Sequence, residues 1–171
     1  MTLVEEYNAA WPSWFEQIRS RIEGPLQGIP HQIEHVGSTA IPDMMAKPII
    51  DIDIVVNPGA FLAVRNRLAK LSYIHQGDLG ILGREAFDLT DADIKSSLPP
   101  HHIYVCERNS NALKEHLAFR NFMRQHPEWR QRLSDLKRFL CEEHGNNNQT
   151  YMDGKAAMVI EITGLAMNDA K

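Results

Sequence analysis

The sequence predicts an α/β (α+β) fold: a small mixed β-sheet with flanking helices and a helical C-terminal segment. Two observations predict it. Short apolar runs typical of strands alternate with amphipathic stretches early in the chain, whereas the last third shows the three- and four-residue apolar spacing of helices. The length of 171 residues fits one domain over residues 1–171, and no convincing boundary interrupts it.

The first elements expected are a helix, a short strand and a central strand. Trp11-Pro12 begins the helix, because proline suits a first helical turn, and Gly28-Ile29-Pro30 ends it. A strand over 33–36 leads into a Gly37-Ser38 turn. The central strand over 49–56 is almost continuously apolar, as expected for a strand covered on both faces.

The rest of the chain predicts three more strands, a second helix and three C-terminal helices. Gly77, Gly80 and Gly83 mark tight turns between two of the strands. The expected segments are a helix after Asn57-Pro58-Gly59 to about Leu71, strands over 71–75, 85–89 and 101–107, a polar loop over 91–100, and helices over 112–126, 127–144 and 151–167.

Two aspartates alternate with apolar residues on the central strand. Asp51 and Asp53 point to one face, since successive strand side chains alternate, and the isoleucines beside them point to the core. Neighbouring carboxylates repel each other, and burying them unpaired is costly. A divalent cation such as Mg²⁺ or Mn²⁺ is the simplest remedy, and backbone amides or arginines are the alternative.

The net charge and the composition limit the binding partners and the cellular location that can be expected. A net charge of −4 argues against a large nucleic acid spread over a basic surface, although a local basic pocket can still hold a small nucleotide. No apolar run approaches the roughly 20 residues of a membrane span, and the acidic first residues do not suit a signal peptide. Cys106 and Cys141 suit reduced thiols, so a cytoplasmic protein is expected.

A Gly-Ser turn, a spacer of 12 residues and Asp-x-Asp on a strand resemble the nucleotidyltransferase superfamily that includes DNA polymerase β. The resemblance implies that Gly37 lets the backbone approach a triphosphate and that Ser38 holds phosphate oxygens. It implies that Asp51 and Asp53 are catalytic carboxylates that hold the metal. Taken alone, the Gly37-Ser38 dipeptide is an ordinary turn.

The chain resembles one branch of that superfamily more closely, the GrpB family of predicted nucleotidyltransferases. The matching segments extend from the region of Trp11 to the final helix, so the resemblance covers nearly the whole chain. They are residues 34–40 with 46–51, 80–84, 101–105, 119–128 and 151–155.

Four further residues are candidates for binding the nucleotide or its phosphates. Thr39 follows Ser38 in the same turn. Lys47 precedes Pro48 and suits either a phosphate-facing cation or a surface lysine. Arg84 lies in a glycine-rich turn, and its guanidinium can bind phosphate bidentately. Lys155 lies in a family-matched segment of the last helix, from which it could reach a nucleotide.

The wider superfamily has a third carboxylate on a neighbouring strand, and this sequence shows none. The neighbouring strand is expected to be 101–107, whose inward residues are His102 and Tyr104. His102 is therefore a catalytic candidate, as a metal ligand or as a general base. Glu34, Glu85 or Glu107 could instead supply an acid.

Other polar residues are expected to be structural. Charged side chains on amphipathic helices are usually solvated, and His35 either binds ligand or braces the turn that follows it. Those expected on solvated helix faces are Arg120 and Lys137, and those expected at the surface or at helix caps are His116, His126 and His144.

The resulting prediction is a nucleotidyltransferase that binds a nucleoside triphosphate and a divalent metal and transfers a nucleotidyl group to a small-molecule acceptor. The missing acid motivates an alternative, a non-catalytic nucleotide- or metabolite-binding protein on the same fold. A metal-dependent phosphohydrolase that uses His102 with the two aspartates is a third reading.

Overall fold

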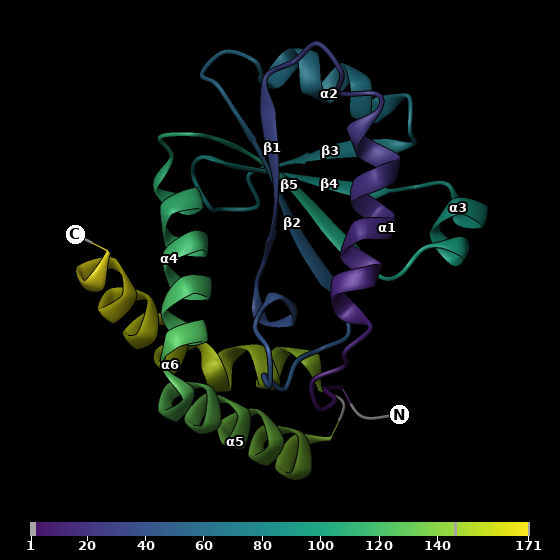
Figure 1. Ribbon diagram of the computed structural model, residues 1–171. Helices are drawn as coiled ribbons and strands as arrows, with labels where there is room; N and C mark the ends of the chain where they lie inside the picture. The colour runs from purple at the N-terminus through teal and green to yellow at the C-terminus, as the bar shows by residue number, and fades with distance from the viewer. Residues whose placement is uncertain (1–2, 146, 171) are drawn as a thin grey trace.

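The computed structural model describes residues 3–145 and 147–170 and shows a five-stranded mixed sheet with flanking helices (Figure 1). Residues 1–2, 146 and 171 of the range assigned to one domain lie outside the described residues, and the single domain stays a prediction. The elements are α1 (Trp11–Glu23), β1 (His31–Val36), the 3₁₀ turn η1 (Ser38–Ala40), β2 (Ile50–Val56), α2 (Phe61–Ala69), β3 (Tyr73–Gly77), β4 (Arg84–Leu89), α3 (Ala92–Ser97), β5 (His101–Glu107), α4 (Asn111–Gln125), α5 (Pro127–His144) and α6 (Asn148–Asp169).

The strand order is β1-β2-β5-β4-β3, and β2 with β5 is the parallel pair among antiparallel ones. The predicted neighbour of the central strand is therefore confirmed. In this register Asp51 lies opposite His102 and Asp53 lies opposite Tyr104. The mixed sheet places the two aspartates and the two aromatic residues on one face.

One face of the sheet carries the main core. The isoleucines of β2 point into it, as the alternation predicts, and they are completely buried. Helix α1 supplies Trp11, Ile18 and Ile22 from above them, and α2 supplies Val64 and Leu68. The aspartates consequently face the opposite side of the sheet, away from the main core.

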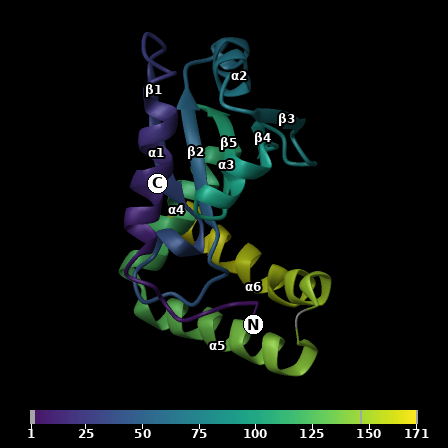
Figure 2. The ribbon, with the colours of Figure 1, turned by 90° about the vertical axis from the view of Figure 1, so that its right-hand side faces the viewer.

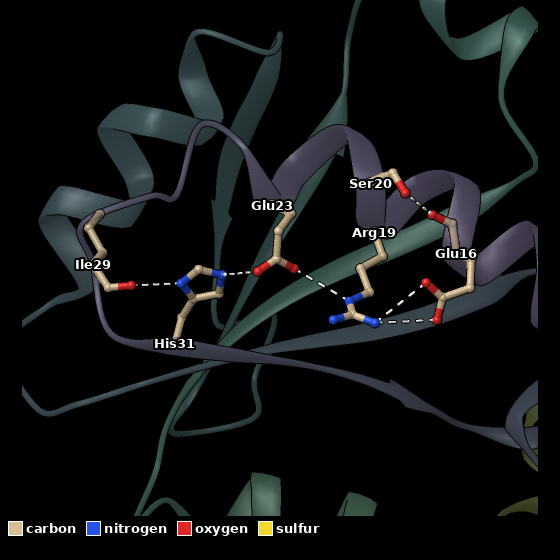
Figure 3. Close-up of polar contacts among 6 residues, drawn as sticks. All are labelled: Glu16, Arg19, Ser20, Glu23, Ile29 and His31. Atoms are coloured by element: carbon tan, nitrogen blue, oxygen red, sulfur yellow. Dashed lines mark hydrogen bonds and ion pairs between the residues drawn. The ribbon is translucent and has the colours of Figure 1, made fainter.

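Polar contacts lie along helix α1 and between its C-terminal end and β1 (Figure 3). Arg19 lies between Glu16 and Glu23 on the exposed side of the helix. Glu23 lies 3.4 Å from Nε2 of His31, whose Nδ1 lies 2.7 Å from the carbonyl oxygen of Ile29. The two contacts of His31 therefore connect the start of β1 with the end of α1 and with the turn between them.

Several boundaries differ from the sequence prediction, among them the start of β1 at His31 rather than residue 33 and the start of α6 at Asn148 rather than residue 151. Residues 91–100 were expected as a polar loop, but they contain α3. Asp91 caps this helix, since its carboxylate accepts a hydrogen bond from the backbone amide of Ile94, and Ile94 packs against the main core. Strand β3 begins at Tyr73 rather than Leu71, because Ser72 has a positive φ of 67° and ends the preceding turn.

The three C-terminal helices cover the second face and one end of the sheet. Helix α4 packs on the face that carries the aspartates, where Leu113 contacts Val55 and Cys106. Helices α5 and α6 lie across the end of the sheet at which β2 and β5 begin (Figures 1 and 2). A second core forms between these helices and the segment after β1. Among the described residues, no helix combines the length and the apolar character required to cross a bilayer.

Candidate functional site

The carboxylates of β2 differ in their surroundings. Asp53 is completely buried, and its Oδ2 lies 2.8 Å from Nδ1 of His116 on α4. Its Oδ1 is buried without a hydrogen-bond partner. Burial raises the pKa of the Asp53 carboxyl, although the hydrogen bond from His116 opposes this. Asp51 is partly exposed. The pair therefore has an unsatisfied buried oxygen next to an accessible carboxylate.

The Gly37-Ser38 turn lies directly against Asp51. Gly37 has a φ of 71°, a conformation that favours glycine, and a β-carbon there would collide with Oδ2 of Asp51. The hydroxyl of Thr39 donates to the carbonyl oxygen of Ile49 at the start of the central strand. His35 braces the same turn through a 3.0 Å contact between its Nε2 and Oγ1 of Thr39. Glycine is thus required where the turn meets the carboxylate.

Lys137 of α5 is an unexpected member of this site. Its side chain is buried, and its Nζ donates to Oγ of Ser38 at 2.9 Å and to the carbonyl oxygen of Met45 at 2.8 Å. Burial holds the pKa of the Lys137 ammonium well below its usual range, and the nearby Lys155 and Lys47 lower it further. The buried amino group of Lys137 therefore contacts the serine that the sequence assigns to phosphate binding.

Lys47 and Lys155 complete a cluster of three lysines around one cavity. Nζ of Lys47 hydrogen-bonds Oδ1 of Asn148, and both ammonium groups lie over the ring of Tyr151, at 4.6 Å and 5.2 Å from its centroid. Burial lowers the pKa of each. The cavity has a volume of about 430 Å³, and we call it the lysine pocket. It is lined by Ser38, Thr39, Ala46, Lys47, Ile49, Asp51, His102, Tyr104, Lys137, Asn148, Tyr151, Met152 and Lys155.

His102 and Arg84 lie on the strands beyond the aspartates. Nδ1 of His102 lies 3.0 Å from Oδ1 of Asp51, and this hydrogen bond raises the pKa of His102. The guanidinium of Arg84 lies 4.4 Å above the ring of Tyr104, and its Nε is buried without a partner. Arg84 does not line the lysine pocket, and its position over Tyr104, which lies opposite Asp53, puts it on the aspartate-bearing face of the sheet.

A second cavity lies beside the same carboxylate. It has a volume of about 680 Å³ between α4 and α6, and we call it the apolar pocket. It shares Ser38, Asp51 and Lys155 with the lysine pocket. Its full lining is Gly37, Ser38, Asp51, Ile81, Glu115, His116, Phe119, Lys155, Val159, Ile160, Thr163, Gly164 and Met167.

The three glutamates considered as a third acid do not join the aspartates. Glu34 lies opposite Asp53 on β1, but its carboxylate is paired with Arg120 at 2.8 Å. Glu85 and Glu107 lie on the other face of the sheet, where they contact His75 and the backbone amide of Gly59. Within residues 3–145 and 147–170, no group of three or more His, Cys, Asp or Glu side chains is arranged to hold a metal ion.

His116 and Lys137 were wrongly expected on surfaces or helix caps. His116 faces Asp53, because α4 packs on the aspartate-bearing face of the sheet. The apolar spacing could have placed both residues inward. His116 lies three residues from Leu113 and from Phe119, and Lys137 lies four residues after Leu133 and three before Leu140.

The fold is similar to that of a nucleotide polymerase. The similar solved structures include a Cid1 poly(U) polymerase mutant bound to MgATP and the MgGTP-bound enzyme. Each has a TM-score of 0.54 and 9% identity and covers 77% of this chain and 42% of that chain. At this identity the likeness concerns the fold alone.

The chain belongs to the GrpB family, since the model described as "GrpB protein" matches residues 2–164. The crystal structure of conserved protein GrpB from Enterococcus faecalis has a TM-score of 0.83 and 28% identity, covering 98% of both chains. The resemblance read from the sequence is therefore confirmed.

Curated relatives agree with the family but differ in length. Glutamate-rich protein GrpB of Alkalihalophilus pseudofirmus is 30% identical over 154 residues, covering 89% of this chain and 88% of that protein. UPF0157 protein YqkA of Bacillus subtilis is 31% identical over 150 residues, which cover 87% of this chain. The match spans only 42% of the length of YqkA.

Proposed function

We propose that this protein is a cytoplasmic nucleotidyltransferase that binds a nucleoside triphosphate with Mg²⁺ or Mn²⁺ and transfers its nucleotidyl group to a small-molecule acceptor. One observation carries the proposal. Three lysines, Ser38 and Asp51 line one small cavity, and Asp53 lies two residues further along the same strand, so that amino groups suited to a triphosphate lie beside carboxylates suited to a metal ion.

The lysines support a site for the triphosphate. Lys47, Lys137 and Lys155 repel one another, and burial lowers the pKa of each. A polyanion in the lysine pocket would relieve that repulsion and accept hydrogen bonds from the three ammonium groups. Ser38 and the backbone of the turn would contact the same phosphates. We assign Lys137 to the phosphate-binding residues together with Gly37, Ser38, Thr39, Lys47 and Lys155.

The aspartates support a site for the metal. The unpartnered Oδ1 of Asp53 and the accessible carboxylate of Asp51 are hard oxygen donors, and Mg²⁺ is commonly held by one or two carboxylates together with substrate phosphates. Asp51 and Asp53 would hold the ion. When bound, it would supply charge neutralisation for the phosphates. Arg84, on the aspartate-bearing face of the sheet, would add positive charge at the edge of the site.

The transfer forms one bond and breaks one. The acceptor hydroxyl oxygen bonds to the α-phosphorus, the bond from that phosphorus to the α,β-bridging oxygen breaks, and pyrophosphate leaves. The hydroxyl proton passes to solvent or to an imidazole beside the carboxylates, for which His102 is one candidate. The chain contributes by holding the phosphates on the lysines and by fixing the carboxylates on a rigid strand.

Calorimetric titration with ATP, GTP, CTP and UTP in the presence of Mg²⁺ tests the proposal. We expect at least one nucleotide to bind the wild type, and the Asp51→Asn/Asp53→Asn variant to bind it at least about tenfold more weakly in Mg²⁺. Equal affinity of the two proteins would refute the metal role. Absence of binding by the wild type would refute the nucleotide site.

Two other functions remain alternatives. The pairing of Asp53 with His116, in place of a third acid, favours a non-catalytic nucleotide or metabolite sensor. Retained nucleotide binding without pyrophosphate release across a broad acceptor screen would support the sensor. Tight stoichiometric zinc in the purified protein would instead support a phosphohydrolase that uses His102 and the aspartates.

A further inference from the structure

We propose that the apolar pocket binds the acceptor of the transfer and that this acceptor is a small, largely apolar molecule carrying a hydroxyl group. This inference rests on the proposed function and adds the chemical class of the second substrate. It is carried by the position of the pocket, by its lining and by its few polar groups.

The position suits an acceptor. The lysine pocket and the apolar pocket share Ser38, Asp51 and Lys155, so they meet at the carboxylate that would hold the metal. A triphosphate on the lysines and a second molecule between α4 and α6 would therefore approach each other at Asp51. A nucleophile and its phosphorus must be held adjacent in this way before reaction.

The side chains that line the apolar pocket favour a ligand that is largely apolar. Phe119, Val159, Ile160 and Met167 form the walls on α4 and α6, and Ile81 approaches from the loop between β3 and β4. Ile160 is 72% exposed and Ile81 is 40% exposed. Exposed apolar side chains lining a concave site gain free energy when an apolar ligand covers them. The volume of about 680 Å³ lies in the range of small-molecule sites.

The polar groups are few and can fix a hydroxyl. Nδ1 of His116 is occupied by Asp53, and His116 also lines the apolar pocket, so its Nε2 remains as a hydrogen-bond partner for a ligand. Thr163 donates its hydroxyl proton to the carbonyl oxygen of Val159, which leaves Oγ1 free to accept. A hydroxyl held near His116 would lie on the side of the pocket that Asp51 borders.

The charges argue against a nucleic-acid acceptor. Among the described residues that line the apolar pocket, Lys155 is the one lysine or arginine, while Glu115 and Asp51 are acidic. A bound oligonucleotide brings a phosphate for each residue and requires several cations along its path. We therefore infer an uncharged acceptor rather than an RNA end.

Gly164 provides the sharpest test of this pocket. It lines the pocket from the middle of α6, and a β-carbon added there would meet no atom within 4 Å. Leucine is also a better helix former than glycine, so Gly164→Leu fills the pocket without endangering the fold. Ala157→Leu is the matched control, because Ala157 is exposed on the same helix and lines neither pocket.

The experiment measures saturation-transfer NMR of three probes with the full chain: 2-naphthol, glucose as a polar polyol, and a hexauridylate. We expect 2-naphthol to bind at least about tenfold more tightly than glucose. Gly164→Leu should weaken the binding of 2-naphthol about tenfold or more, and Ala157→Leu should leave it within about twofold. The inference is overturned if Gly164→Leu leaves 2-naphthol binding unchanged, or if glucose or the hexauridylate binds more tightly in a manner sensitive to Gly164→Leu.

Nucleotide titration of the same proteins separates this inference from the proposed function. Gly164→Leu should bind nucleoside triphosphate with Mg²⁺ as the wild type does, since residue 164 does not line the lysine pocket. Nucleotide binding without 2-naphthol binding overturns the acceptor assignment and leaves the nucleotide site standing. Naphthol binding without nucleotide binding overturns the proposed function and, with it, the role of the pocket as an acceptor site.

Discussion

Gly37 packs its α-carbon against the carboxylate of Asp51, at a backbone φ of 71° that L side chains rarely adopt. The turn that would hold phosphate and the strand that would hold metal are therefore in direct contact. No side chain separates them, so a change at residue 37 acts on both.

Gly37→Ala should destabilise the fold by about 3 kcal/mol or more, because it adds a steric collision with Asp51 to the roughly 1–3 kcal/mol cost of a backbone conformation that essentially only glycine adopts. Urea denaturation measures the change. Gly59→Ala is the matched control, since Gly59 has a φ of 83° and open space around it. Equal losses in the two variants would show that the contact with Asp51 carries no energetic weight.

Asp53 and His116 should show strong energetic coupling. The carboxylate is buried and accepts its one observed hydrogen bond from the imidazole, and such bonds to charged groups contribute about 1.5–3 kcal/mol. A double-mutant cycle with Asp53→Ala and His116→Ala, measured by urea denaturation at pH 7 without metal, reports this coupling energy. Additive effects of the two substitutions would contradict the pairing.

Lys137→Met should separate ligand binding from stability. The side chain of methionine is about as long as that of lysine but cannot ionise. The substitution therefore removes the cost of burying an ionisable group, and we expect the melting temperature to stay unchanged or to rise. Loss of its contact with phosphate should weaken nucleotide binding about tenfold or more in calorimetry. Lys114→Met removes an exposed lysine of α4 and serves as the control. Nucleotide affinity that is the same in both variants would exclude Lys137 from the site.

His35 should make the protein less stable in acid. Burial lowers the pKa of His35 from 6.5 to about 4 in the folded state, so the unfolded chain binds more protons between these values. Stability should therefore rise with pH across the window from about 4 to 6.5, by up to about 3 kcal/mol from this residue.

The His35 contribution can be isolated with His35→Gln, which keeps a donor for Thr39 and does not titrate. The unfolding free energy of the wild type minus that of the variant should decrease as pH falls through the window. His144→Gln, at an exposed histidine at the end of α5, is the control variant. A constant difference between wild type and His35→Gln would rule out the buried neutral imidazole.

The sequence predicted those parts of the fold that have a clear pattern of apolar residues. The alternation in 49–56 correctly predicted which side chains of β2 enter the core, and residues 101–107 were correctly predicted as the strand beside β2, although without its parallel direction. Helix α3 was missed because its six residues are too few for an apolar period to be read. Its only local marker is the capping residue Asp91.

Within the candidate site, the sequence predicted only the contacts between residues that are close together in the chain. The contact of the Gly37-Ser38 turn with Asp51 follows from a short connection between two strands. His116 and Lys137 reach the site from helices more than sixty residues away, at separations of 63 from Asp53 and 99 from Ser38. The helical spacing of apolar residues could have predicted that His116 and Lys137 point inward. It could not predict which strand or turn each helix packs against, because that depends on the tertiary structure.

The contact between Lys137 and Ser38 has a consequence for the protein during its synthesis. A ribosome adding about 5–20 residues per second needs roughly 5–20 s to extend the chain from residue 38 to residue 137. During that interval the nascent chain holds the serine and both aspartates but lacks the lysines of the last two helices. The proposed nucleotide site is therefore complete only after the last two helices are made, and a ribosome-bound fragment that ends at β5 should not bind nucleotide.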